Sequence, residues 1–188
     1  LAKDAPLMTH PGFEFVQGRI QDIVGSVLQG CSVVVHLAGC PDDADWDNVL
    51  LPSNIQGTVA LLQAIEAHNV AAAGEDYPRI RRLIVASSGK LFAGYRSTYP
   101  IEADTRPAPV CAYGATKAFV EAAAEAFSCD IVSGCPVTCL RFGWCPRTPE
   151  DVEAMRRSVE DDGMPDEFLS PRDAATCIRA AALHRGAD

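Results

Sequence analysis

The order of segments along the chain is the feature that most restricts its fold. Short apolar runs rich in β-branched residues alternate with longer segments of helical character. Two of these runs, SVVVHLAG (32–39) and RLIVASSG (82–89), end in small or polar residues. Runs of this kind are typical of strands that are buried on both faces of a parallel sheet. A third apolar run, PVTCLRFG (136–143), is also predicted to be a strand.

Helical patterns separate these strands. Apolar residues with a 3.6-residue period predict a helix from about 48 to 68, and a second helix is expected at about 113–128. SPRDAATCIRAAAL predicts another, with Ser170 or Asp173 as its cap. Because strands and helices alternate, we predict an α/β fold with a parallel sheet flanked by helices, in one domain over residues 1–188.

Three other segments are assigned from their composition. FEFVQ (13–17) is predicted to be a short strand, followed by a polar turn and a brief helix over 23–30. The polar stretch from 146 to 167 is expected to be mobile. The Pro-rich, acidic stretch from 96 to 111 is expected to be a long loop, and long loops in compact domains often serve function.

Composition argues against several classes of partner. The net charge is −9, so the chain lacks the surplus of Lys and Arg that binds a nucleic-acid backbone, and we expect no nucleic-acid partner. We expect no membrane partner either, because no apolar run approaches the roughly 20 residues that span a bilayer. The eight cysteines include no C-x-x-C pair, so we expect no metal site and mostly buried free thiols, with disulfides as the alternative. Free thiols favour a reducing, cytoplasmic location.

The candidate chemistry gathers where the predicted strands end. In open parallel sheets, ligands bind at the carboxyl ends of the strands, so HLAG, ASSG and LRFG should line one crevice. Tyr113 and Lys117 lie four positions apart, on one face of the following helix. A phenol has a pKa of about 10, so an ammonium group near Tyr113 would favour its phenolate, and Ser88 at the strand end could hydrogen-bond the substrate oxygen. Alone, however, Tyr-x-x-x-Lys is a common pair on exposed helices.

The surrounding segments make the pair specific, because they resemble the extended short-chain dehydrogenase/reductase family, also called the NAD-dependent epimerase/dehydratase family. The matching segments occur in the family's order: GRIQD (18–22), VVVHLAG (33–39), NIQGTVALLQAI (54–65), VASSG (85–89) and YGATK (113–117). Ser88 and Tyr113 are 25 positions apart, as the resemblance expects. The resemblance covers about residues 13–184 and implies a Rossmann-like sheet.

The resemblance implies roles for the central residues. Ser88 would orient the substrate, and Tyr113 would be the general acid/base. Lys117 would lower the pKa of Tyr113 and hold the nicotinamide ribose of NAD or NADP. The cofactor would also contact Asp22 near its adenine, and Leu37, Ala38, Gly39 and Ala86 along the dinucleotide path.

Two buried polar candidates have alternative interpretations. Asn54 would contact the cofactor directly or fix backbone groups between strands. His36 in VVVHLAG would be a ligand or, as we favour, a satisfied core histidine.

The substrate expectation also comes from the resemblance. LRFGWCP followed by FLSPRDAA is most similar to the uronate dehydrogenase branch, so we expect a sugar substrate, and specifically a uronic acid. Arg141 would bind its carboxylate, since a planar guanidinium suits bidentate contact, or would form a structural salt bridge. That branch has Asn-His after the catalytic Ser, where this chain has Gly89 and Lys90. Both are assigned to the substrate pocket, with a solvated loop position as the alternative for Lys90.

The family's opening strand, GxxGxxG turn, helix and second strand have no counterpart before residue 13. We therefore expect a sheet that is incomplete on its N-terminal side and lacks the phosphate-binding turn. Three explanations are open: about 50 residues precede Leu1, a second polypeptide supplies the segment, or the domain has lost nucleotide binding. The starting leucine favours the first.

Two functions follow from these alternatives. One is an NAD(P)-dependent sugar oxidoreductase or epimerase with a Ser-Tyr-Lys set. The resemblance allows such an enzyme to be a homodimer that pairs through the helix carrying Tyr113 and the helix before it. The other is a catalytically inactive Rossmann-like structural or regulatory subunit of a larger assembly.

Overall fold

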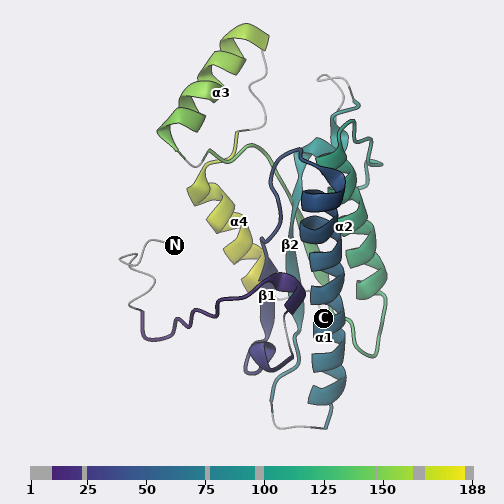
Figure 1. The fold of residues 1–188 in the computed structure, drawn as a ribbon. Helices are drawn as coiled ribbons and strands as arrows, with labels where there is room; N and C mark the ends of the chain where they lie inside the picture. The colour runs from purple at the N-terminus through teal and green to yellow at the C-terminus, as the bar shows by residue number, and fades with distance from the viewer. Residues whose placement is uncertain are drawn as a thin grey trace.

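The computed structural model describes residues 10–22, 25–74, 77–95, 100–146, 148–162 and 168–184. Strands and helices alternate through most of this length (Figure 1). The strands are β1 (Val33–His36), β2 (Arg82–Ser88) and β3 (Val137–Phe142), and the α-helices are α1 (Gly57–Ala72), α2 (Ala112–Ser128), α3 (Pro149–Asp162) and α4 (Pro171–Leu183). Short helices complete the set: η2 (Ile20–Asp22), η3 (Gly25–Leu28), the π-helix η4 (Trp46–Gln56) and η5 (Gly89–Phe92).

The three strands form one parallel sheet in the order β1-β2-β3. This arrangement confirms the predicted α/β class and the three predicted strands. In Figure 1, α1 and α2 lie side by side on one side of the sheet and α4 lies on the other. Because all three strands are parallel, their carboxyl ends lie at one edge of the sheet.

The core lies between the sheet and the α1–α2 layer. Leu83 and Val85 of β2 point into it and are at most 1% exposed, and they pack with Ile65 of α1 and with Val120 and Phe127 of α2. Ile84 alternates to the opposite face of β2 and is fully buried as well. The prediction that β2 is buried on both faces is confirmed.

The same prediction is wrong for β1. Val35 of β1 is 40% exposed, and Leu37 just beyond the strand is 56% exposed. Among the described residues β1 pairs only with β2, and α4 packs against β2 and β3. Within that part of the chain, one edge of β1 is unpaired and Val35 on one of its faces is uncovered, despite the apolar sequence.

The prediction of a strand at 13–17 is also wrong. These residues have no regular structure, and Phe15 and Val16 are 55% and 57% exposed. A strand is stabilised by the backbone hydrogen bonds of a neighbour. No described residue pairs with this segment, so its apolar sequence alone does not make a strand.

The prediction for the segment 146–167 is wrong in the opposite sense, because part of the segment is a helix. Its polar composition indicates a mobile stretch and no helix is predicted there, yet α3 begins at Pro149. Thr148 and Asp151 form a capping box, in which each side chain accepts the backbone N–H of the other residue at 3.1 Å. The Thr-Pro-Glu-Asp sequence is the signal for this helix start. Residues 163–167 lie outside the described part.

The helix predicted at 48–68 is longer and is divided into two types. Its first part, η4, is a π-helix that contains Pro52, and its second part is α1. Pro52 has no N–H, and its carbonyl accepts the N–H of Gly57 five residues later. The brief helix expected after residue 22 is represented by η3, while residues 23 and 24 lie outside the described part.

The remaining helices match their predictions, and α4 is capped by Ser170, whose hydroxyl accepts the N–H of Asp173 at 3.0 Å. All eight cysteines are unpaired, but only Cys135 is buried, so the expectation of mostly buried thiols is wrong. In the described ranges no helix is long and apolar enough to span a bilayer. Those ranges also contain no cluster of metal-binding side chains.

Candidate functional site

The candidate active site lies where the carboxyl end of β2 meets the first turn of α2. The Ser88 hydroxyl accepts the N–H of Lys90 at 3.2 Å and lies near enough to the Tyr113 phenol to lower its pKa. The Lys117 ammonium lies 5.7 Å from the centre of the Tyr113 ring. The three residues predicted to be catalytic are therefore neighbours in space, although they come from two elements.

A glycine makes this approach possible. Gly114 follows Tyr113, and a Cβ at this position would lie 2.7 Å from the carbonyl oxygen of Lys90 and 3.1 Å from Pro109. Any larger residue would push the first turn of α2 away from the end of β2. The glycine in YGATK thus brings the phenol within reach of Ser88.

The pKa of Tyr113 differs in direction from the expectation. It is raised above its ordinary value, first because the phenol is buried and then because Asp42 and the Cys40 and Cys111 thiols lie nearby. The contact with Ser88 acts in the opposite direction and lowers the pKa. The net direction is upward because burial outweighs the contribution of Ser88, and Lys117 is not among the causes that lower the pKa.

Lys117 is itself buried, with 8% exposure. Its ammonium donates a hydrogen bond to the carbonyl of Ala86 at 2.8 Å, and burial lowers its pKa. Ala86, predicted to contact the cofactor, therefore anchors Lys117 in this structure.

The carboxyl end of β1 is more open. The three residues predicted to follow the cofactor path, Leu37, Ala38 and Gly39, are all exposed, as is Asp22 in η2. A groove of about 440 Å³ lies beside Gly39. It is lined by Arg19, by Ile20 and Gln21 of η2, by Gly39 and Cys40, and by Asn48, Val49, Pro52 and Ser53 of η4. The lining combines apolar side chains with amide and hydroxyl groups and with the cation Arg19. Asp22 is not part of this lining.

The contacts of Asn54 match the interpretation in which its side chain fixes backbone groups. Its Oδ1 accepts the N–H of Cys40 at 2.7 Å, and its Nδ2 donates to the carbonyl of Cys40 at 3.1 Å and to Thr116 Oγ1 at 3.0 Å. The side chain is 2% exposed. It thereby joins the end of β1, η4 and α2.

His36 matches the core interpretation. Its Nε2 lies 3.1 Å from the hydroxyl of Thr58, which in turn donates to the carbonyl of Asn54 at 2.6 Å. A hydroxyl has one hydrogen, so Nε2–H of His36 must be the donor to Thr58. Burial, aided by the positive charge of Lys117, lowers the pKa of His36 to about 4, and the ring is neutral at pH 7.

Arg141 is held in a salt bridge, which matches the interpretation that its role is structural. Its Nε and Nη2 donate to the two carboxylate oxygens of Glu121 at 3.0 and 2.9 Å, and Ser87 donates to the same carboxylate at 2.6 Å. The remaining nitrogen, Nη1, donates to the carbonyl of Ala103 at 2.8 Å. Arg141 thus ties β3, α2 and the long loop together. Its bidentate contact is with Glu121, so a contact with a substrate carboxylate stays a prediction.

The two residues after Ser88 have different surroundings. Gly89 begins η5 and is half-buried. Lys90 is exposed, and its backbone N–H donates a hydrogen bond to the Ser88 hydroxyl. Their assignment to a substrate pocket stays a prediction.

Sequence reasoning missed three residues near the site. Glu121 lies four positions after Lys117, and Ser87 pairs with Arg141 in the sheet register, so helix and strand periodicity could have grouped them. Asp43 accepts the N–H of Tyr113 at 2.8 Å. It lies 70 positions earlier in the chain, and nothing local in the sequence indicates this contact.

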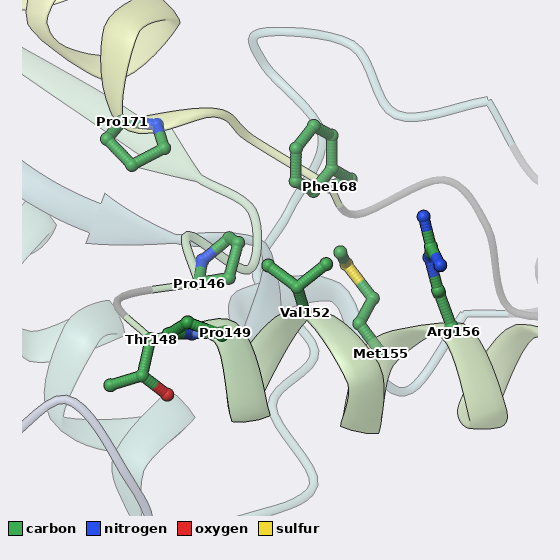
Figure 2. Close-up of a pocket in the computed structure, with 8 residues that line it drawn as sticks. All are labelled: Pro146, Thr148, Pro149, Val152, Met155, Arg156, Phe168 and Pro171. Carbon is green, nitrogen blue, oxygen red and sulfur yellow. The ribbon is translucent and has the colours of Figure 1, made fainter.

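A second concavity lies away from these residues. It is an open groove of about 520 Å³ between α3 and the start of α4 (Figure 2). Its walls are mainly apolar, with Arg156 at one end, and its lining comprises Pro146, Thr148, Pro149, Val152, Met155, Arg156, Phe168 and Pro171. None of the predicted catalytic or cofactor residues lines it, so we place the candidate site at β2 and α2 instead.

Comparisons with known proteins agree with this geometry. The sequence model described as the NAD dependent epimerase/dehydratase family matches residues 2–143. The chain belongs to the NAD-dependent epimerase/dehydratase family. No curated protein sequence is significantly similar to it.

Solved structures of family members share the fold. Uronate dehydrogenase from Agrobacterium tumefaciens has a TM-score of 0.71 and 24% identity, over 93% of this chain and 58% of that one. MoeE5, in complex with UDP-glucuronic acid and NAD, has a TM-score of 0.72 and 22% identity, over 90% and 58%. UDP-glucuronic acid 4-epimerase from Bacillus cereus, in complex with UDP-glucuronic acid and NAD, has a TM-score of 0.62 and 22% identity, over 74% and 42%. The chain therefore spans about half the length of these structures.

Proposed function

We propose that this protein is an NAD(P)-dependent oxidoreductase or epimerase that acts on a sugar and uses Ser88, Tyr113 and Lys117. The observation that carries the proposal is the gathering of Ser88, Tyr113 and Lys117 at one place, with the Lys117 ammonium 5.7 Å from the tyrosine ring. Membership of the family supports the same reaction class. The three groups lie at the carboxyl edge of the sheet, where parallel α/β folds bind ligands.

The chemistry of the three side chains is complementary. The Tyr113 hydroxyl would hold or move the proton of a sugar hydroxyl group. Ser88 would hydrogen-bond the same sugar oxygen and keep it aligned with the phenol. Because the pKa of Tyr113 is raised, its phenol is the protonated form near neutral pH, and Ser88 is the neighbour that eases proton loss.

A nicotinamide cofactor would supply the redox step by accepting or donating a hydride at a sugar carbon. The groove beside Gly39, Cys40 and η4 is the candidate for one part of it, and Leu37 and Ala38 lie next to that groove in sequence. Asp22 is proposed near the adenine. Lys117 would hold the ribose next to the reacting sugar. Solved relatives in complex with NAD support NAD, with NADP as the alternative.

A uronic acid is the proposed substrate class. Solved relatives include uronate dehydrogenase and proteins in complex with UDP-glucuronic acid. For Arg141 to bind a substrate carboxylate, it would have to leave Glu121, so Lys90 and Gly89 beside Ser88 are the other candidates. We also propose a homodimer through α2 and α1, where Phe119 is 37% exposed.

The alternative is a structural or regulatory subunit without turnover. Among the described residues β1 pairs only with β2, so its other edge could pair with a strand from elsewhere in either case. Catalysis and such pairing are separable by experiment.

Lys117→Ala tests the proposed enzyme. We expect it to weaken NAD binding in calorimetric titration and to lower kcat for uronic acid oxidation by at least about a hundredfold, because the ribose contact and the charge are both lost. Arg81→Ala is a control, since this cation is exposed and precedes the amino end of β2, opposite the site. Normal binding and kinetics in Lys117→Ala would contradict the proposed role, and a protein extended upstream of Leu1 that binds neither NAD nor NADP would favour the inactive subunit.

A further inference from the structure

We propose that Asp43 is a positioning residue for Tyr113, and this inference rests on the proposed function of Tyr113. Asp43 lies in the loop after β1, and its Oδ1 accepts the backbone N–H of Tyr113 at 2.8 Å. Tyr113 is the second residue of α2. Its N–H therefore belongs to the group of helix-start donors that have no acceptor within the helix. The carboxylate supplies that acceptor from another part of the chain.

The local cap of α2 is a weak one. Its N-cap residue is Cys111, whose sulfur accepts the N–H of Gly114 at 3.4 Å. A thiol is a weak acceptor, and Ser, Thr, Asp and Asn are the residues that normally cap helices. The carboxylate of Asp43 is negatively charged and lies at the positive end of the helix dipole, so it is the stronger cap. The start of the catalytic helix thus depends on a residue outside it.

The contact also fixes the loop itself. Cys40, at the other end of this loop, is held through its backbone by Asn54, which donates to Thr116 of α2. Thr116 in turn donates to the carbonyl of Tyr113 at 2.7 Å. The loop from Cys40 to Asp43 is therefore attached to the first turn of α2 at both ends.

This arrangement gives Asp43 a function in the proposed reaction. The loop continues directly from Leu37, Ala38 and Gly39, which are proposed to contact the cofactor. A fixed loop would keep the phenol of Tyr113 at a constant position relative to the cofactor crevice. Proton transfer depends strongly on position, whereas substrate binding does not need the phenol to be exactly placed.

The first experiment measures amide hydrogen exchange by NMR and needs no substrate. In Asp43→Ala, we expect the Tyr113 amide to exchange at least about tenfold faster than in the wild type. In Asp43→Asn, which keeps an oxygen acceptor, we expect protection close to the wild type. The Ala115 amide, which donates to Cys111 within the helix, is the internal control. Unchanged protection of Tyr113 in Asp43→Ala would overturn the tether.

The second experiment measures kinetics of the same variants. We expect kcat to fall about fivefold to tenfold in Asp43→Ala and to return to within twofold in Asp43→Asn, with KM for NAD and for the sugar within twofold throughout. Adding Cys111→Ser to Asp43→Ala strengthens the local cap only, so it should stabilise the helix without restoring kcat. Full recovery of kcat in this double variant, or unchanged kcat in Asp43→Ala, would overturn the positioning role. A wild type that is extended upstream of Leu1 and is still inactive would contradict the proposed function, and the exchange result would then decide the tether alone.

Discussion

The neighbouring strands β1 and β2 differ in how the rest of the molecule covers them. Val35 of β1 pairs with Ile84 of β2 in the parallel register, yet Val35 is 40% exposed and Ile84 is fully buried. Their carboxyl ends differ in the same way, since Ser88 is 7% exposed and Leu37 is 56% exposed. Burial of a strand is thus decided by the elements on each side of it. The proton-transfer groups lie at the covered strand, and the proposed cofactor path lies at the uncovered one.

The largest expected difference between the strands is in stability. Ile84→Ala should lower the free energy of unfolding by about 3 to 4 kcal/mol, because it removes a fully buried side chain and leaves a cavity. Val35→Ala, at the paired position, should cost less than about 1 kcal/mol, because much of its side chain is already in water. Urea denaturation of both variants measures the difference. Equal losses would mean that β1 is covered in solution.

His36 is the residue of β1 that is as buried as its neighbours in β2. Its titration makes the stability of the protein depend on pH, which gives a second comparison of the two strands. Its pKa is about 4 in the folded protein and about 6.5 when unfolded, so the unfolded state binds more protons between these values. The stability that comes from the neutral ring is complete above about pH 6.5 and is lost as the pH falls toward 4. The loss should be on the order of 2 to 3 kcal/mol.

Denaturation curves at several pH values measure this effect, and His36→Gln is the matched variant, since an amide can still donate to Thr58. The variant should show a flatter dependence between pH 4 and 6.5. The same slope in both proteins would assign the titration to other groups.

A smaller loss of stability is expected from a change at Arg141 of β3, on the other side of β2. Arg141→Ala should lower the free energy of unfolding by roughly 2 kcal/mol, because the half-buried Glu121 carboxylate loses its bidentate partner. In a double-mutant cycle, Glu121→Ala should recover part of that loss. If the two changes add without coupling, the salt bridge contributes nothing. A rise in KM for uronic acids in Arg141→Lys, with stability retained, would instead favour the substrate role.

The fold class and the three strands of the sheet can be predicted from the sequence. Periodicity and small residues at strand ends are local signals, and they are sufficient to group Ser88, Tyr113 and Lys117 at one edge of the sheet. Burial of β1, the absence of a strand at 13–17 and the contact of Asp43 with Tyr113 depend on which segments meet in space. The direction of the pKa of Tyr113 is not predictable either, because it is decided by burial and by Asp42, Cys40 and Cys111 together. The start of α3 has a local signal in its capping box, which composition alone does not reveal.

The most direct test of the central claim is the turnover of Tyr113→Phe with NAD and uronic acids. The variant removes one oxygen atom, so we expect kcat to fall by about a thousandfold or more while the circular dichroism spectrum and the Kd for NAD stay unchanged. Tyr77→Phe, a tyrosine that stacks on His68 outside the site, should retain wild-type activity. If Tyr113→Phe turns over as fast as the wild type, Tyr113 is not the proton-transfer group and the proposed mechanism is wrong.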